Sequence, residues 1–238
     1  MKNILVCLTV VMSVALVGCE KMKTVEWRVW EKWTKDDDST VVVIANLTQG
    51  AYITRLLVVG HADREGAMFE YGKPASEQLQ AVAEGGQVEP MAAIYEAEGG
   101  QVVFAPDEGL LGPGESTTVA LDKEHTRISL VAMILPTNDG FVALDNVLLR
   151  DGEQLLYAID SGTEANDEQI TGGGAPNTPG IPADPGGQAN AEAPGIIGLS
   201  AEGVVDRHPG ISGADGSALS SEDHGWSGPV VSVTVSIK

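Results

Sequence analysis

The chain has 238 residues, of which 20% are charged, and its formal net charge at pH 7 is −20. This charge repels phosphate backbones and argues against nucleic-acid binding, while it suits solubility in a salty or cation-rich exterior. The two cysteines, Cys7 and Cys19, both lie near the N-terminus. The rest of the chain therefore has no disulfide, no cysteine nucleophile and no cysteine-ligated zinc.

The first 18 residues have the pattern of an export signal. Lys2 is followed by an apolar run, Ile4–Val17, and then by Gly18 and Cys19. A basic start, a short apolar segment and a small residue before the cut are typical of a secretory signal peptide. The ending Leu16-Val17-Gly18-Cys19 resembles a bacterial lipoprotein signal. That resemblance implies removal of residues 1–18 and acylation of Cys19, which would anchor the protein to a membrane.

A transmembrane anchor is the alternative, but the apolar run is shorter than the roughly 20 residues that a spanning helix needs. Residues 19–40 are interpreted as a tether next to the anchor. The tether holds three tryptophans among basic residues, which suits either a membrane interface or the start of the first strand. Glu20 stands where the lipoprotein pattern has Asp for inner-membrane retention. The resemblance therefore favours the outer membrane or the cell surface.

Residues 41–238 are predicted to form one mostly β domain. Runs of β-branched and apolar residues recur between Gly- and Asp-rich breaks, and the last run alternates apolar and polar residues as a half-buried strand does. These features favour an antiparallel β-sandwich. The strand-like runs are Val41–Leu47, Ile53–Val59, Val102–Ala105, Thr117–Leu121, Ile128–Leu135, Phe141–Leu149, Leu155–Ile159 and Val230–Ile237.

Two short helices and one long loop interrupt these strands. Ser76 is a candidate N-cap for a helix over Glu77–Glu84 that Gly85 ends, and Pro90 opens a second helix through Glu96. Residues 171–195 are rich in Gly, Pro and Ala, without a period. A domain linker is one interpretation. We favour a long loop, because the final strand has no partners of its own and must rejoin the sheet.

Two acidic segments follow strand-like runs, Thr137–Phe141 and Asp160–Glu168. Calcium takes six to eight oxygen ligands, and carboxylates, amides and main-chain carbonyls in such loops supply them. The segments therefore indicate a calcium site shared by two loops, with merely solvated acids as the alternative. The second segment is not an EF-hand loop, because positions 3, 6 and 12 counted from Asp160 are Gly, Ala and Thr.

Six phrases taken together resemble the spondin N-terminal domain family. In order along the chain they are Val43–Gly50, Phe69–Leu79, Thr137–Asp145, Asp160–Asn166, His208–Ile211 and Trp226–Val230. The resemblance implies a β-sandwich akin to calcium-dependent membrane-binding domains, with calcium held by Asp139, Asp160 and Glu164. Glu164 stands where the animal members have Asp, and their cysteines are missing here, so animal matrix partners are not carried over.

The leading hypothesis is a non-enzymatic, lipid-anchored, calcium-binding module for adhesion or surface structure, with a partner outside the cell or in the periplasm. One alternative is an enzyme that hydrolyses glycans with paired carboxylates such as Asp139 and Asp160. The sequence has no Gly-x-Ser-x-Gly elbow, phosphate-binding glycine loop or zinc-type histidine spacing. The other alternative is a structural scaffold without a ligand.

Overall fold

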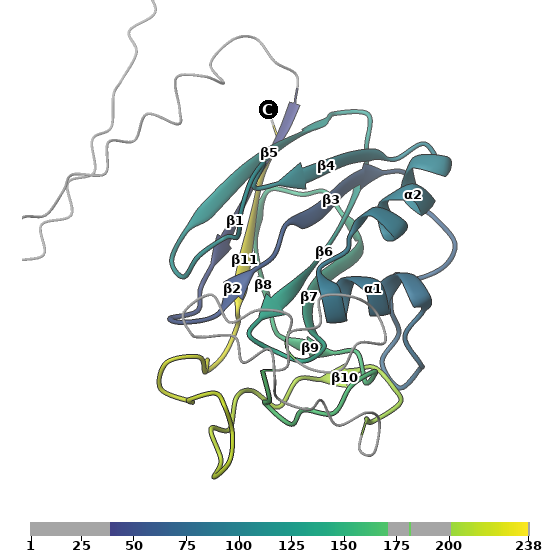
Figure 1. The fold of residues 1–238 in the computed structure, drawn as a ribbon. Helices are drawn as coiled ribbons and strands as arrows, with labels where there is room; N and C mark the ends of the chain where they lie inside the picture. The colour runs from purple at the N-terminus through teal and green to yellow at the C-terminus, as the bar shows by residue number, and fades with distance from the viewer. Residues whose placement is uncertain (1–38, 171–180, 182–200, 238) are drawn as a thin grey trace, which may run out of the picture. The chain divides into compact units, whose positions relative to one another are not determined.

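The computed structural model describes residues 39–170, 181 and 201–237. The expected signal peptide, Cys19, the tether up to residue 38 and most of the Gly/Pro-rich segment lie outside these residues. One compact unit, Asp38–Lys238, contains all the described residues, and its sheets and helices are drawn in Figure 1.

The described residues form eleven strands and two helices. In chain order these are β1 (Ser39–Asn46), β2 (Tyr52–Ile53), β3 (Leu56–His61), α1 (Glu77–Gly85), α2 (Glu89–Ala97), β4 (Gln101–Ala105), β5 (Ser116–Asp122), β6 (Arg127–Leu135), β7 (Gly140–Leu148), β8 (Gly152–Leu156), β9 (Ile159–Asp160), β10 (Asp206–Arg207) and β11 (Val231–Ile237).

The strands make two antiparallel sheets. The first has the order β5-β1-β11-β8, so β11, at the end of the chain, lies between β1 and β8. The second has the order β10-β9-β7-β6-β3-β4, and β2 also pairs with β6. The prediction of a mostly β, antiparallel sandwich with two helical insertions is therefore confirmed.

The core between the two sheets follows from the alternation of residues along each strand. Val42 and Ile44 of β1 are fully buried, while the residues that alternate with the buried ones along this strand are partly exposed. They meet side chains from the second sheet, such as Leu130 of β6. Burying one such side chain contributes about 1.5–3 kcal/mol, so this layer holds the two sheets together.

The two helices cover the other face of the second sheet, which explains why β3 is buried throughout. Leu56 and Val58 belong to the core between the sheets, whereas Leu57 and Val59 pack toward the helices. Ser76 caps α1 by accepting a hydrogen bond from the backbone of Leu79, as the sequence predicts. Burial on both faces is typical of a strand between two layers.

The chain changes sheets in the middle of one expected strand. Leu155–Ile159 was predicted as a single run, but β8 belongs to the first sheet and β9 to the second. Tyr157 and Ala158 make the crossing. The expected strand Ile53–Val59 is likewise broken, because Thr54 turns its backbone and its hydroxyl toward Met133.

Candidate functional site

The first acidic segment forms the tight turn between β6 and β7. Thr137 fixes this turn because its hydroxyl donates to the carbonyl of Ile134 and accepts from the amide of Gly140, at 2.9 Å. A side chain on Gly140 would lie 2.7 Å from the Thr137 hydroxyl and 2.9 Å from the ring of His208. The turn therefore needs glycine at this position, and the next residue back, Asp139, is fixed toward the neighbouring loop.

Asp139 is completely buried, with an exposed fraction of 0%. Its Oδ2 accepts hydrogen bonds from the Ser161 hydroxyl and the Thr163 amide, both at 2.8 Å, and from the Glu164 amide at 3.1 Å. Its Oδ1 is buried and has no hydrogen-bond partner in the part of the chain that the structure describes. An acceptor left unsatisfied in the interior costs free energy, so this oxygen is in place to bind something else.

Asp160 lies beside this turn, because Gly140 of β7 and Asp160 of β9 are register partners. It is 2% exposed. Its Oδ1 accepts from the amide of Gly162 at 2.7 Å, and its Oδ2 accepts from the side-chain amide of Asn166. Gly162 has a φ of +70°, and a side chain there would lie 2.2 Å from the carbonyl of Val204. The loop after β9 is thus held against Gly203 and Val204.

The pKa values of the two carboxyl groups, Asp139 and Asp160, are both raised. Burial raises the pKa of Asp139, although hydrogen bonds from Glu164, Ser161 and Thr163 oppose the shift. Burial and the charge of Asp139 raise the pKa of Asp160 to about 7. Two buried like charges cannot both stay ionised without a counter-charge, and either a proton or a cation supplies one.

The structure brings the three predicted ligands into one loop cluster but not to one point. Glu164 is 8% exposed, and its backbone contacts Asp139. Oxygens on one calcium ion lie at most about 5 Å apart, twice a ligand distance of 2.3–2.6 Å. Asp139, Asp160 and Glu164 are not among the described groups whose ligand atoms all lie within 4.8 Å of one another.

Two further acidic residues adjoin this cluster: Glu202, which lies outside the two predicted acidic segments, and Glu168, which ends the second segment. Glu202 adds negative charge near both aspartates, and it follows the Gly/Pro-rich segment, where no sequence signal marks it. Glu168 is 6% exposed and anchors the loop at Ser212–Ser217, accepting from the Gly213 amide at 3.0 Å. Burial works against its charged form, but these hydrogen bonds lower the pKa of Glu168.

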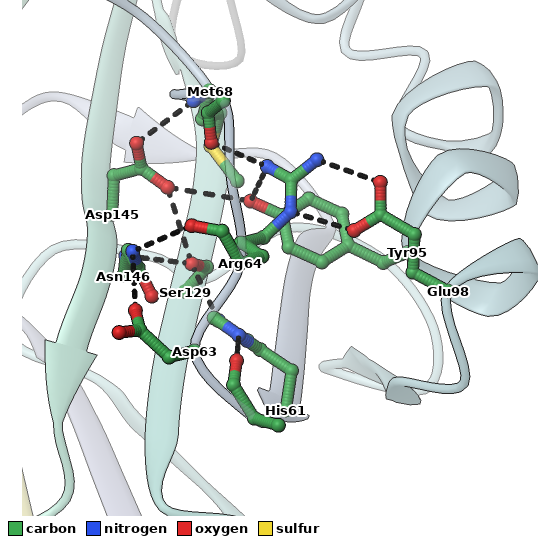
Figure 2. Close-up of polar contacts among 11 residues, drawn as sticks. His61, Asp63, Arg64, Met68, Tyr95, Glu98, Ser129, Asp145 and Asn146 are labelled. Atoms are coloured by element: carbon green, nitrogen blue, oxygen red, sulfur yellow. Dashed lines mark hydrogen bonds and ion pairs between the residues drawn. The ribbon is translucent and has the colours of Figure 1, made fainter.

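A second polar cluster lies under α2, on the helix face of the second sheet, and Figure 2 shows it. His61 Nε2 and the Ser129 hydroxyl are 2.9 Å apart, and Asp145 is 3.3 Å from that hydroxyl. Asp145 also accepts from the Met68 amide at 2.8 Å and from the Tyr95 hydroxyl at 3.3 Å. The cluster therefore ties β6, β7, α2 and the loop after β3 together.

This cluster has the residue types of a catalytic triad without its geometry. Ser129 is 0% exposed, at a bulge in β6, so no substrate reaches its hydroxyl. The second nitrogen of His61 contacts the carbonyl of Ala62, and Asp145 contacts the serine instead of the histidine. A triad needs the carboxylate on the histidine and an accessible nucleophile. The arrangement thus serves packing; burial lowers the pKa of His61.

A third group of ligand-type side chains lies on the turn after β5. Asp122, Glu124 and His125 have ligand atoms that all lie within 4.8 Å of one another. Both carboxylates are exposed, and exposed acidic groups of this kind are common without an ion. His125 packs on Gly60, where a side chain would lie 2.8 Å from the imidazole.

The described domain is a two-sheet β-sandwich with buried carboxylates in the loops at β7 and β9. The profile of the Spondin_N family matches residues 48–182, which cover more than half of the chain and include Asp139, Asp160 and Glu164. The chain therefore belongs to the spondin N-terminal domain family, as its six phrases predicted. Membership indicates an extracellular binding or structural module.

No curated protein matches this chain closely enough to count as a relative. The matched range ends before β10 and β11, although β11 completes the first sheet. Among the described residues, no helix is long and apolar enough to cross a membrane.

Proposed function

We propose that the domain binds calcium in the loops at β7 and β9, as part of an exported, lipid-anchored module for adhesion or surface structure. The observation that carries this proposal is the Oδ1 of Asp139, a buried carboxylate oxygen without a partner, next to a second buried carboxylate. A cation there removes the repulsion between Asp139 and Asp160 and satisfies the free oxygen.

The donor set fits a hard cation. Asp139, Asp160 and Glu164 supply carboxylate oxygens, and calcium accepts six to eight such ligands in flexible geometry. Magnesium demands a tighter octahedral shell and holds its waters, so it suits loops of this kind poorly. Because the three carboxylates do not converge in the described conformation, binding includes an adjustment of their side chains.

The function of the ion follows from what it connects. The turn at Asp139 belongs to the β6–β7 hairpin, and the loop after Asp160 contacts Gly203 and Val204. An ion bound between the turn at Asp139 and the loop after Asp160 fixes both of these segments. A fixed loop surface binds a partner at a lower entropic cost. Acylation at Cys19 would hold this surface at the outer membrane or the cell surface, within reach of a partner outside the cell.

A glycan hydrolase is the second candidate, and the burial of its would-be carboxylates opposes it. A glycosidase places its two carboxyl groups on either side of an accessible glycosidic bond. Asp139 and Asp160 are 0% and 2% exposed and accept hydrogen bonds from their own loops. A ligand-free scaffold is the third candidate, and calcium titration separates it from the first.

The test is thermal unfolding of the protein in calcium and in chelator. An ion that binds only the folded form stabilises it by about 2.7 kcal/mol at a hundredfold excess over Kd, which raises the Tm by roughly 5–10 °C for a domain of this size. Asp139→Asn should abolish most of this rise. Asp206→Asn is the matched control, because Asp206 pairs with Asp160 across β9 and β10 but is exposed.

Equal melting curves in calcium and in chelator would leave Asp139, Asp160 and Glu164 as buried structural acids. The anchor has its own test. Intact-mass analysis should find a diacyl or triacyl adduct on Cys19, and Cys19→Ser should release the protein from membranes. An unmodified N-terminus would refute the lipoprotein assignment.

A further inference from the structure

A cavity of about 250 Å³ lies where the chain crosses from the first sheet to the second. Tyr157 and Ala158, the crossing residues, form one wall. Arg207 belongs to β10, the register neighbour of β9, His208 directly follows this strand, and Trp226 comes from the segment before β11. Three segments distant in sequence thus build one concave surface next to, but separate from, the carboxylate loops.

Two aromatic side chains give this cavity flat apolar surfaces. Tyr157 is 46% exposed, so its ring is open to a ligand. Trp226 is partly buried and packs on both the core between the sheets and a small cluster around Ile211. Its ring lies 5.3 Å from that of His208, at a tilt of 51°. The tryptophan is therefore held rigidly, and a rigid aromatic binds at a low entropic cost.

The cavity is also lined by two side chains that can donate hydrogen bonds, His208 and Arg207. The amide of Gly210 donates to Nδ1 of His208 at 3.0 Å, so the neutral ring carries its proton on Nε2. That nitrogen is buried and has no hydrogen-bond partner among the residues that the structure describes, and His208 is 5% exposed. The Arg207 guanidinium lies over the ring of Tyr157, 5.2 Å from its centre, and forms no salt bridge with the described residues.

We infer that this cavity binds one neutral hexopyranose unit of a glycan. The C–H face of a sugar ring is apolar and slightly positive, so it packs against the aromatic rings of Tyr157 and Trp226. Its hydroxyls accept hydrogen bonds from Arg207 and, directly or through one water, from His208. The volume is below the 300–1,000 Å³ of pockets for drug-sized ligands, and this suits a single ring.

The charge of the protein favours a neutral sugar over an acidic one. The chain carries a net charge of −20, and Asp206, next to Arg207, is exposed. An acidic sugar would gain one contact with Arg207 but would approach against the field of the whole chain. The inference goes beyond the calcium proposal and does not depend on it, since the cavity is formed by residues other than Asp139, Asp160 and Glu164.

Saturation-transfer NMR on the full chain tests this inference, with the methyl pyranosides of glucose, galactose and mannose as neutral probes and glucuronate as the acidic probe. At least one neutral probe should give signals in chelator as well as in calcium. Tyr157→Ala should weaken its binding by about tenfold, which corresponds to about 1.4 kcal/mol. Arg207→Lys should also weaken it, because lysine lacks the planar fork that stacks on tyrosine.

Two matched variants serve as controls. Tyr71→Ala removes a tyrosine that is 58% exposed and does not line the cavity, and Arg150→Ala removes an arginine elsewhere on the surface. Both should bind as the parent protein does. The inference is overturned if no neutral probe binds, if glucuronate alone binds, or if binding survives Tyr157→Ala. The sugar probes are also measured in chelator, where no calcium is bound. A protein that does not bind calcium could therefore still confirm this inference.

Discussion

Gly140 and Asp160 are register partners across β7 and β9, and this pairing puts the Asp160 carboxylate beside that of Asp139. Burial and the charge of Asp139 raise the pKa of Asp160 to about 7 from its usual 3.8. At neutral pH the metal-free fold thus holds a carboxyl group at the midpoint of its titration. The pairing therefore couples the ionisation of Asp160 to the charge of Asp139.

The first prediction concerns stability against pH without metal. Asp160 keeps its proton to about pH 7 in the folded protein but loses it near pH 4 when unfolded. Its contribution to stability is therefore full below about pH 4 and is lost as the pH rises toward 7 and above. Asp160→Asn should remove this loss, so its Tm relative to the parent protein should be higher at pH 8 than at pH 5, in chelator.

The pKa of His208 is shifted in the direction opposite to that of Asp160, so its effect on stability against pH has the opposite sign. Burial lowers its pKa to about 4 from 6.5, so its contribution is lost as the pH falls from about 6.5 to 4. In the parent protein the contributions of Asp160 and His208 partly cancel as the pH falls. Asp160→Asn removes the first of them, so the stability of this variant should fall more steeply on acidification than that of the parent protein. Parallel Tm curves for the two proteins between pH 5 and 8 would contradict the raised pKa of Asp160.

The second prediction concerns calcium affinity against pH and rests on the proposed function. Calcium binds the ionised carboxylate, so below pH 7 it must displace the proton of Asp160. The apparent Kd should rise about tenfold for each pH unit below 7 and level off above it. Titration calorimetry in two buffers of different ionisation enthalpy should detect about one proton released per ion at pH 6. A Kd equal at pH 6 and pH 8 would rule out this linkage.

The sequence predicts much of the fold because alternation and capping act locally. Val231, Val233 and Val235 alternate with polar residues, and all three are buried in β11. Strands β9 and β10 escape prediction because two residues are too few for a periodic pattern. The break at Thr54 also escapes, since it depends on hydrogen bonds to Met133, which lies 79 positions away.

The candidate sites divide in the same way. Asp139 and Asp160 are acidic residues at strand ends, and this pattern can be recognised in the amino-acid sequence. The unpartnered Oδ1 of Asp139 and the nearby charge of Glu202 depend on how three loops meet. His208 is buried because its amide bonds to Ala158 and its ring packs on Gly140. Such contacts between distant segments have no signature in composition or spacing.

The third prediction concerns the polar cluster under α2. Asp145→Ala leaves the amide of Met68 and the hydroxyl of Tyr95 without their acceptor, and buried donors without partners cost about 1–3 kcal/mol. The Tm should fall by roughly 3–10 °C. Glu98→Gln should have a smaller effect, because the Glu98 side chain is 46% exposed and water can replace its bond to Arg64. Equal effects of the two substitutions would contradict this assignment of roles.

The fourth prediction concerns the end of the chain. Strand β11 pairs with β1 from Thr40–Ile237 to Asn46–Val231 and with β8 on its other side. Deleting residues 230–238 removes four buried valines, each of which contributes about 1.5–3 kcal/mol, and it leaves two strand edges open. A domain stable by 5–15 kcal/mol does not survive that loss, so the truncated protein should show no cooperative unfolding transition.

A shorter truncation is the control for this prediction, because it tests whether the loss of C-terminal residues outside the core also abolishes cooperative unfolding. Removing residues 236–238 takes away the exposed Ser236 and Ile237 and the hydrogen bond from Ile237 to Asp151, but it keeps all four buried valines. This form should melt cooperatively, a few degrees below the parent protein. If the longer truncation also melted like the parent protein, β11 would be an addition to a sandwich that is stable without it, and the pairing of the two ends of the domain would not hold the first sheet together.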